Sequence, residues 1–312
     1  MKYFMRKIFG FLITLVIISV LIFFAFELIP GDPAIQRLGT EATEISIQNL
    51  REEMGLNRPA PVRYASWVIG LFTGDLGESF SFQIPVQDML LDKLPITITI
   101  TLLSFFMILI LSIPISMLCA RYRSSLLDTI ILSLNQITMS VPAFFVGMLF
   151  TFLFGILLRW FVPGGYVSYQ VNVWEFLSYL ILPSFAIALP RAAMTSKILR
   201  NSLIEELNKD YVRTSLSRGS TLTRVLVFHA LKNGFLPIIT FLGLTLADIV
   251  TNSIIIERVF GIPGLGSVFL SSIANRDYPV VKAIIFFLGV FILLLNLSAD
   301  LLYAKLDKRI DV

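Results

Sequence analysis

The stretch ITITITLLSFFMILILSIPISMLCA, residues 96–120, contains no charged side chain. A helix needs about 20 apolar residues to cross the hydrocarbon core of a membrane. Lipid offers no hydrogen-bond partner to backbone N–H and C=O groups, so such a run is expected to be helical. This stretch therefore indicates an integral membrane protein built from helices.

Five further segments qualify as membrane spans, at approximately 8–29, within 129–158, and at 176–196, 233–256 and 281–303. The fourth of the six is the weakest, because Pro183 and Pro190 interrupt it and Arg191 and Lys197 cap it. Of the 312 residues, 56% are hydrophobic and only 15% are charged, whereas soluble domains carry about 25% charged residues. We predict an all-α integral membrane protein with six transmembrane helices.

Two apolar segments have alternative interpretations. The first run follows a basic MKYFMRK and could be a signal peptide, but it is longer than a typical signal and no small-residue cleavage motif follows it. We interpret it as an uncleaved first span. The uncharged run 259–275 could be a seventh span, but its FGIPGLG motif (260–266) makes a poor continuous helix. We interpret that run as an excursion that does not span.

The distribution of charge predicts the orientation. The loop 30–93 holds five basic and nine acidic residues, whereas the segment 191–232 holds eight basic and three acidic ones. Basic segments stay on the cytoplasmic side, so both termini and the segment 191–232 are expected to be cytoplasmic. The chain then divides into a first transmembrane helix (1–29), an extracytoplasmic loop region with short helices at 44–56 and 62–73 (30–93), a transmembrane core (94–305) that contains a cytoplasmic loop (203–232), and a cytoplasmic tail (306–312).

The cytoplasmic loop contains a long polar stretch, DYVRTSLSRGS (210–220). Leu203, Leu207 and Tyr211 recur at a spacing of four, which predicts one helix face, and Glu205 with Lys209 is a favourable i,i+4 pair. Gly219 then breaks the helix, and Ser220 or Thr221 can cap the next one. Periodicity alone leaves two interpretations open: a solvated basic loop, or a docking element for a cytoplasmic partner.

A series of motifs resembles the permease subunits of binding-protein-dependent ABC importers, and most of all their oligopeptide/dipeptide/nickel branch. The resemblance covers nearly the whole chain, and the motifs in order make it specific. They are LIPGDP (28–33), GDLGESF (74–80), VPAFFVGML (141–149), LNKDYVRTSLSRGSTLTRVLVFHALKNGFLPIITFLG (207–243), ERVFGIPGLG (257–266), NRDYPVV (275–281) and DLLYAKLDKRI (300–310).

The resemblance implies a type I importer architecture in which a coupling helix of the cytoplasmic loop docks on an ATPase. The residues that match this ATPase-coupling loop are Asp210, Tyr211, Arg213, Gly219, His229 and Pro237. The general importer pattern has Glu-Ala-Ala, three residues and Gly. Here Arg213, Thr214 and Ser215 stand in place of Glu-Ala-Ala, as the peptide/nickel branch has it, and Gly219 is kept.

The resemblance also implies the partners. They are a second homologous permease subunit, two cytoplasmic ABC ATPase subunits and an extracytoplasmic substrate-binding lipoprotein, assembled in the lipid of a bacterial or archaeal cell membrane. The chain has no G-x-x-x-x-G-K-[ST] phosphate loop. We therefore expect no enzyme activity and no cofactor on this chain, with ATP and Mg²⁺ bound by the partner ATPases.

Metal and nucleic-acid chemistry are not favoured. One cysteine and one histidine cannot build a site from several such ligands, so no metal site is expected. The net charge of +4 is explained by membrane topology rather than nucleic-acid binding. His229 could be a nickel ligand or a proton carrier, but we favour a hydrogen-bonding residue that ties the loop to the fifth span.

Polar residues inside the spans are candidates for lining a translocation pathway. They are Asn135 and Gln136 in the third span and Asp248, Thr251 and Asn252 in the fifth. An Asp at the centre of a span costs about 2.5–3.5 kcal/mol on insertion scales. Such residues face either a cavity or a neighbouring helix, and the sequence leaves both interpretations open for Asp248.

The function expected from these features is half of a translocation pathway, coupled to ATPase subunits, for oligopeptides or dipeptides. Nickel or metal-chelate import by the same architecture is the alternative, since the motifs are shared. An ion-coupled secondary transporter would usually show paired repeats with interrupted helices, which the sequence lacks. A membrane enzyme would need a cluster of reactive side chains that one His and one Cys do not provide.

Overall fold

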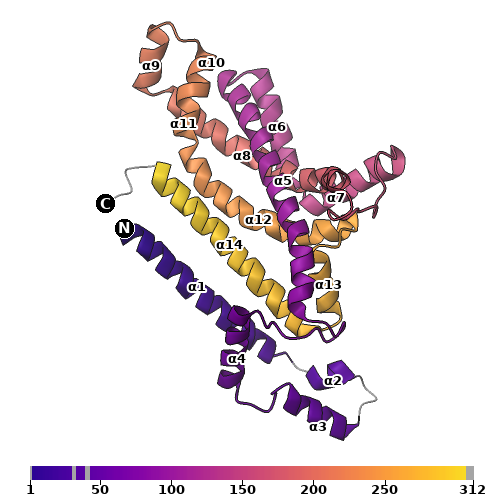
Figure 1. Cartoon of the computed structure of the whole chain (residues 1–312). Helices are drawn as coiled ribbons and strands as arrows, with labels where there is room; N and C mark the ends of the chain where they lie inside the picture. The colour runs from indigo at the N-terminus through magenta and orange to yellow at the C-terminus, as the bar shows by residue number, and fades with distance from the viewer. Residues whose placement is uncertain (1, 30–32, 39–42, 307–312) are drawn as a thin grey trace. The chain divides into compact units, whose positions relative to one another are not determined.

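The computed structural model describes residues 2–29, 33–38 and 43–306. Within these residues the regular elements are all helices, and β pairing is limited to an isolated bridge between Glu78 and Pro85. The chain divides into two compact units, 1–96 with 263–293 and 97–262 with 294–312, and the boundary falls inside two long helices. Both units are drawn in Figure 1.

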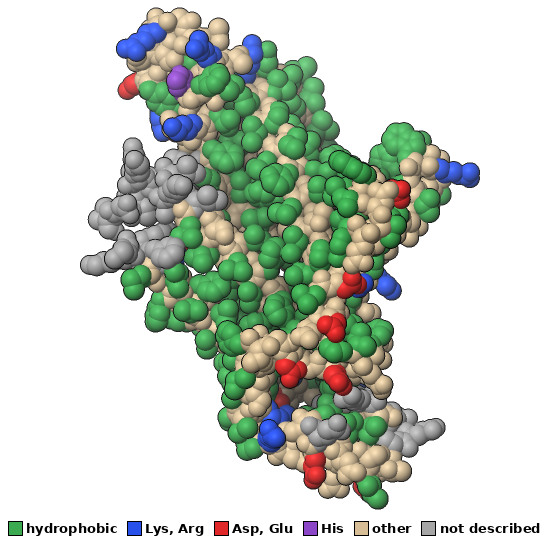
Figure 2. Space-filling view, viewed as in Figure 1, with side chains coloured by type: hydrophobic (Ala, Val, Ile, Leu, Met, Phe, Trp, Pro, Cys, Tyr) green, Lys and Arg blue, Asp and Glu red, His purple; other side chains and the backbone are tan. Residues whose placement is uncertain are grey.

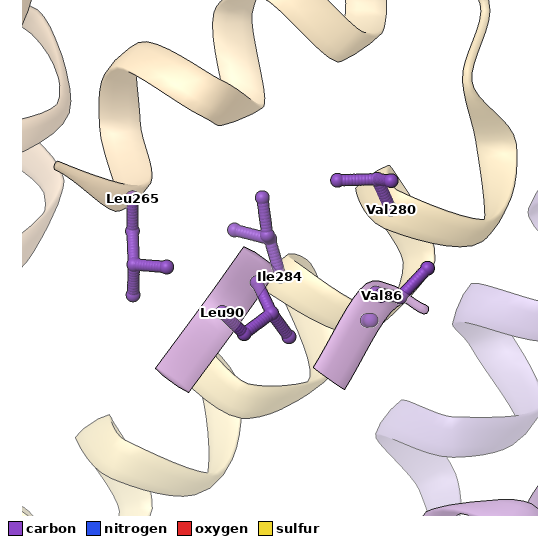
Figure 3. Packing of buried hydrophobic residues seen from close by; sticks show 6 residues of the cluster. Val86, Leu90, Leu265, Val280 and Ile284 are labelled. Carbon is purple, nitrogen blue, oxygen red and sulfur yellow. The ribbon is translucent and has the colours of Figure 1, made fainter. Parts of the chain in front are cut away.

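Unit 1 contains the N-terminal helices and the segments around α13. Its elements are α1 (Lys2–Glu27), α2 (Pro33–Leu38), α3 (Glu44–Glu53), α4 (Ala60–Thr73), the start of α5 (Val86–Arg121), α13 (Leu265–Ala274) and most of α14 (Tyr278–Leu306). Figure 3 shows its buried apolar cluster, in which Val86 and Leu90 of α5 pack with Leu265 of α13 and with Val280 and Ile284 of α14. Burial of these branched side chains joins segments far apart in sequence.

The short helices that follow α1 pack back against it. Tyr64 and Trp67 of α4 lie with ring centroids 5.5 and 6.0 Å from that of Phe23 in α1, and Arg63 forms an ion pair with Glu27. The two short helices expected at 44–56 and 62–73 are present as α3 and α4, and α2 was not anticipated. Residues 30–32 of the LIPGDP motif lie outside the described residues.

Unit 2 contains the remaining helices. They are the rest of α5, α6 (Leu126–Ser140), α7 (Ala143–Phe150), the π-helical η1 (Thr151–Leu157), α8 (Val173–Leu207), α9 (Asp210–Ser217), α10 (Leu222–Val225), the π-helical η2 (Leu226–Ala230), α11 (Leu231–Gly234), α12 (Leu236–Phe260) and the end of α14. Helix α8 is central, because it contacts α6, α7 and α12. Its buried Ala186, Ala188, Ala192 and Ala193 permit the close approach typical of membrane helices.

By length and composition, α1, α5, α8, α12 and α14 can each cross a membrane, and a bent helix pair makes a sixth candidate among the described residues. The expected six-span helical class is therefore confirmed. Helix α5 has 36 residues and begins ten residues before the predicted span at 96. At 1.5 Å per residue its length is about 54 Å, well beyond the hydrocarbon core.

The third span is not one helix. Helix α6 ends at Ser140, and the axis turns by 96° before the segment 143–157. Val141 has extended backbone angles (φ −94°, ψ 124°), as expected for a residue that precedes a proline. Pro142 also lacks the N–H that would continue the α6 hydrogen bonds. The prediction of a continuous span within 129–158 was wrong in this respect.

The fourth span is longer than expected. Pro183 and Pro190 lie inside α8 without ending it, and prolines are tolerated in membrane helices that pack against neighbouring helices. Arg191 is therefore an interior residue of α8 and does not cap a span, which corrects the sequence-based interpretation. The membrane-sized region extends to Leu207.

The apolar run 259–275 contains only a short helix. Gly261 ends α12 in the left-handed conformation (φ 66°), and α13 has ten residues. Ten residues rise about 15 Å, half of the hydrocarbon thickness. The interpretation that this run does not span is therefore supported by its length. Of the predicted C-terminal tail, residues 307–312 lie outside the described residues.

Candidate functional site

Helix α9 contains most of the polar stretch singled out in the sequence. It runs from Asp210 to Ser217, and Figure 1 shows it beside α10 at one end of unit 2. Asp210 lies in the first turn, where a negative charge suits the helix dipole. Gly219 follows in the left-handed conformation (φ 86°), and the Thr221 hydroxyl accepts a hydrogen bond from the backbone N–H of Arg224 at the start of α10. The expected order of helix, glycine turn and helix is therefore present.

The start of this region differs from the periodicity argument. Helix α8 ends at Leu207 and α9 begins at Asp210, so Leu203, Leu207 and Tyr211 do not share one helix. The Lys209 ammonium pairs with Glu206 rather than with Glu205. Lys209 lies outside α8 and has extended backbone angles (φ −77°, ψ 153°). Its ammonium therefore reaches Glu206, three residues earlier in the chain, and not Glu205. The predicted i,i+4 pair was therefore wrong.

Glu206 fastens α9 to the end of α8. Its carboxylate is buried and accepts hydrogen bonds from Lys209 Nζ and, at 2.7 Å, from the Tyr211 hydroxyl. Two effects raise the pKa of Tyr211 above its ordinary value: the larger is burial of the phenol, and the smaller is its hydrogen bond to the Glu206 carboxylate. The phenol therefore stays protonated and donates to Glu206. Val212, the next residue, is 1% exposed, so one face of α9 is buried.

The turn between α5 and α6 holds the same region from a second direction. Arg121 Nη1 donates to the Thr223 hydroxyl of α10 at 2.7 Å, and Arg123 Nη1 donates to Asn208 Oδ1 at 3.2 Å. Asn208 and Thr223 flank α9 on either side in sequence. The residues on either side of α9 are thus connected to the α5–α6 region, and Tyr211 of α9 is connected to α8.

The opposite face of α9 is open. Asp210 and Arg213 are 98% and 77% exposed at their side chains and lie 3.8 Å apart, Thr214 is exposed, and Ser215 is half-buried. Figure 2 shows Lys and Arg side chains gathered on this end of unit 2. Helix α9 itself carries one Asp and one Arg, so its exposed polar face can dock a groove of another protein through complementary charges of either sign.

Two other residues of the predicted coupling set lie off α9. His229 is in η2 and exposed, and its expected tie to the fifth span stays a prediction. Pro237 is at the start of α12. The Ser202 hydroxyl of α8 donates to the Gly234 carbonyl at the end of the loop at 2.8 Å.

The predicted pathway residues separate into two groups. Asn135 is buried and its Nδ2 lies 3.5 Å from Ser196 Oγ, and Gln136 Oε1 accepts from Lys197 Nζ at 3.2 Å, so both contact α8. Thr251 donates to the Ala247 carbonyl within its own helix. Asp248 and Asn252, in contrast, line one cavity of about 380 Å³ at the α6–α7 bend.

Asp248 has a charged partner that sequence reasoning missed. Its carboxylate forms an ion pair with Arg191 of α8, and Asn252 Nδ2 donates to the Asp248 carbonyl at 2.8 Å and to its Oδ2 at 3.2 Å. The sequence did place Arg191 near a membrane segment, but it assigned this residue to a span end. An arginine within a long span needs a counter-ion, and this requirement could have led from Arg191 to Asp248.

A second ion pair, more deeply buried than the first, also escaped prediction. Arg200 of α8 donates through Nε and Nη2 to the two carboxylate oxygens of Asp128 in α6, a bidentate arrangement. Ser125 caps α6 and accepts from the Asp128 N–H, while the Ser124 N–H donates to Asp128. The Ser-x-x-Asp spacing is that of a capping box, and it could have identified Asp128 as a helix start. Within the described residues no group of three or more His, Cys, Asp or Glu is placed to hold a metal ion.

Comparison with known proteins gives two family matches. Residues 112–312 match the family described as binding-protein-dependent transport system inner membrane component, and residues 1–101 match the N-terminal part of such membrane components.

Three individual relatives align over nearly their full lengths. A probable peptide ABC transporter permease of Sinorhizobium fredii is 32% identical over 99% of this chain and 98% of its own. An oligopeptide transport system permease of Bacillus subtilis is 33% identical over 94% of each chain, and a glutathione transport system permease of Pectobacterium atrosepticum is 33% identical over 99% of each.

Proposed function

Because the chain belongs to the family of inner membrane components of binding-protein-dependent transport systems, we propose that it is the permease subunit of an ATP-driven importer of short peptides, in which α9 couples the pathway to an ATPase. It is a multi-pass protein of the bacterial cell membrane. The observation that carries the coupling role is the fixed base of α9, held by Glu206 on one side and by Arg121 and Arg123 on the other.

The mechanism is mechanical and needs no covalent chemistry on this chain. The exposed face of α9 docks on a cytoplasmic ATPase. When ATP and Mg²⁺ close the dimer of ATPase subunits, α9 moves with its ATPase. The contacts of Glu206, Arg121 and Arg123 pass this movement to α8 and to the α5–α6 turn. A packed region transmits such a displacement instead of absorbing it, and the pathway changes the side to which it is open.

The family match supports ATPase and substrate-binding partners in general, and we propose the full assembly as follows. A second, homologous permease supplies the other half of the pathway, two ATPase subunits bind on the cytoplasmic side, and an extracytoplasmic substrate-binding lipoprotein delivers the substrate. Peptides are favoured over nickel or metal chelates because the three relatives above are named for transport of peptide, oligopeptide and glutathione.

The test uses the importer reconstituted in vesicles with its partner permease, ATPases and binding protein. Arg213→Glu reverses a charge on the exposed face of α9 without removing a buried contact. We expect it to lower stimulation of ATP hydrolysis by peptide-loaded binding protein at least tenfold. The matched control, Arg258→Glu, reverses an exposed arginine at the end of α12 and should leave the stimulation unchanged.

Cross-linking provides an independent test of whether α9 docks on the ATPase. A cysteine at Ser217, exposed on α9, should form a disulfide with cysteines scanned along the docking groove of the ATPase. Uptake that persists after residues 211–219 are scrambled would contradict the coupling role. Uptake driven by a proton gradient with no ATPase present would instead favour a secondary transporter, and uptake of Ni²⁺ but not of peptides would favour the nickel alternative.

A further inference from the structure

The bend between α6 and α7 opens a cavity inside unit 2. Its walls include Ser140, Val141 and Pro142 at the bend, Arg191 of α8, and Asp248 and Asn252 of α12. Its volume of about 380 Å³ lies within the roughly 300–1,000 Å³ of typical small-molecule pockets. The cavity exists because Pro142 turns the chain by 96° and leaves the space that a straight helix would fill.

The two charged side chains that face this cavity, Arg191 and Asp248, are paired with each other but stay partly exposed. Arg191 and Asp248 lie within helices long enough to span a membrane, and their side chains are 33% and 32% exposed. The Arg200–Asp128 pair offers a contrast, with side chains 15% and 3% exposed. A pair required only for packing is expected to be closed like Arg200–Asp128, whereas the Arg191–Asp248 pair remains reachable from the cavity.

We propose that Arg191 and Asp248 form a recognition site for the two charged ends of a short zwitterionic peptide. This inference rests on the proposed function and assigns part of the substrate's path to named residues. In the empty chain the two side chains neutralise each other. With a peptide present, the α-carboxylate binds the Arg191 guanidinium and the α-ammonium binds Asp248, while Asn252 continues to hold the Asp248 carboxylate.

The physical reason is charge compensation. Separating an ion pair in a membrane segment leaves two uncompensated charges, which is strongly unfavourable. A zwitterion brings one charge of each sign, so every charge stays paired throughout the exchange. A metal dication would bind only Asp248 and would be repelled by Arg191, and a singly charged solute would leave one residue without a partner. The pair therefore selects solutes with both charges.

The experiment compares peptide delivery with ATP hydrolysis in the complete reconstituted importer. The double variant Arg191→Gln with Asp248→Asn replaces both side chains by polar amides, isosteric at 248 and shorter at 191, and it removes both charges. With binding protein saturated by radiolabelled glycyl-leucine or trialanine, we expect peptides delivered per ATP to fall about tenfold or more, the loss typical of charged hydrogen bonds. Hydrolysis stimulated by the binding protein should continue.

Two single variants serve as matched controls. Glu175→Gln and Arg258→Gln each remove one exposed charge of the same unit outside the cavity, and both should deliver peptides at the wild-type ratio. Equal delivery by the double variant would overturn this inference alone. A wild-type importer that hydrolyses ATP but imports neither peptide would overturn the proposed substrate and this inference with it.

A measurement on the wild-type chain covers the case in which the double variant fails to assemble. A glycyl-leucine analogue whose leucine carries a diazirine is trapped during transport, irradiated, and located by mass spectrometry. We expect labelling at the cavity wall, including Met139 and Met194, with excess unlabelled glycyl-leucine suppressing it. Labelling of the permease that avoids 139–143, 187–194 and 248–252 would overturn the proposal.

Discussion

The Ser79 hydroxyl donates a hydrogen bond of 2.5 Å to Asp277 Oδ2, across 198 positions of sequence. The backbone N–H groups of Phe80 and Ser81 donate to the same carboxylate at 3.0 and 3.2 Å. Ser79 and Asp277 are both fully buried. The GDLGESF and NRDYPVV motifs therefore meet in unit 1, where one carboxylate fixes the loop before α5 to the start of α14.

Replacing Asp277 should loosen that loop. Asp277→Ala removes one charged acceptor and leaves three donors without their partner, so we expect a loss of about 3 kcal/mol in stability. Asp88→Ala, which removes an exposed acid in the first turn of α5, is the control and should cost under about 1 kcal/mol. Thermal unfolding and limited proteolysis between 74 and 85 measure the two effects. Equal sensitivity of the two variants would contradict the role of Asp277.

The Arg200–Asp128 pair should respond differently to one substitution and to two. Asp128→Ala leaves a mostly buried guanidinium without a counter-ion, and such a change costs about 3–5 kcal/mol. Replacing both residues, with Asp128→Leu and Arg200→Met, removes the two charges together and should recover most of that loss. Thermal unfolding of the wild type, of Asp128→Ala and of the double variant measures these changes in stability. A double variant that is less stable than Asp128→Ala would show that the ion pair itself is required.

The turn at Gly219 tests the backbone between α9 and α10. An added Cβ at Gly219 would meet no atom within 4 Å, so the cost of Gly219→Ala arises from the left-handed conformation alone, about 1–2 kcal/mol. Gly10, in α1, has equally open surroundings without a positive φ, and Gly10→Ala should be neutral or stabilising by up to about 1 kcal/mol. Hydrogen exchange of the α9 and α10 amides should quicken only in Gly219→Ala. Unchanged exchange there would mean that the turn adapts freely.

Orientation in the membrane can be tested with single cysteines. Cys119 is buried and is replaced first, by alanine. A cysteine at Glu52 of α3 should then react with a membrane-impermeant maleimide added outside intact cells, and one at Ser217 of α9 should react only in inverted vesicles. Both positions are exposed, so accessibility depends on the side of the membrane. The reverse pattern would overturn the orientation predicted from basic residues.

The sequence by itself determined the helical membrane class, the six candidate spans, the short helices between the first two spans and the glycine turn after α9. These are local properties: an apolar run long enough to cross lipid must satisfy its own backbone, and a glycine or proline acts on its immediate neighbours. The roles of the coupling and pathway residues stay predictions.

Only the tertiary structure decided which polar groups meet. Arg191 was assigned to a span end, yet it is the counter-ion of Asp248 because α8 and α12 cross there. The helix expected through Leu203 and Tyr211 ends at Leu207, where the following Lys209 and Tyr211 turn back to Glu206. Periodicity describes one helix at a time, whereas the partner of a buried charge lies on another helix, and its identity depends on how the helices pack.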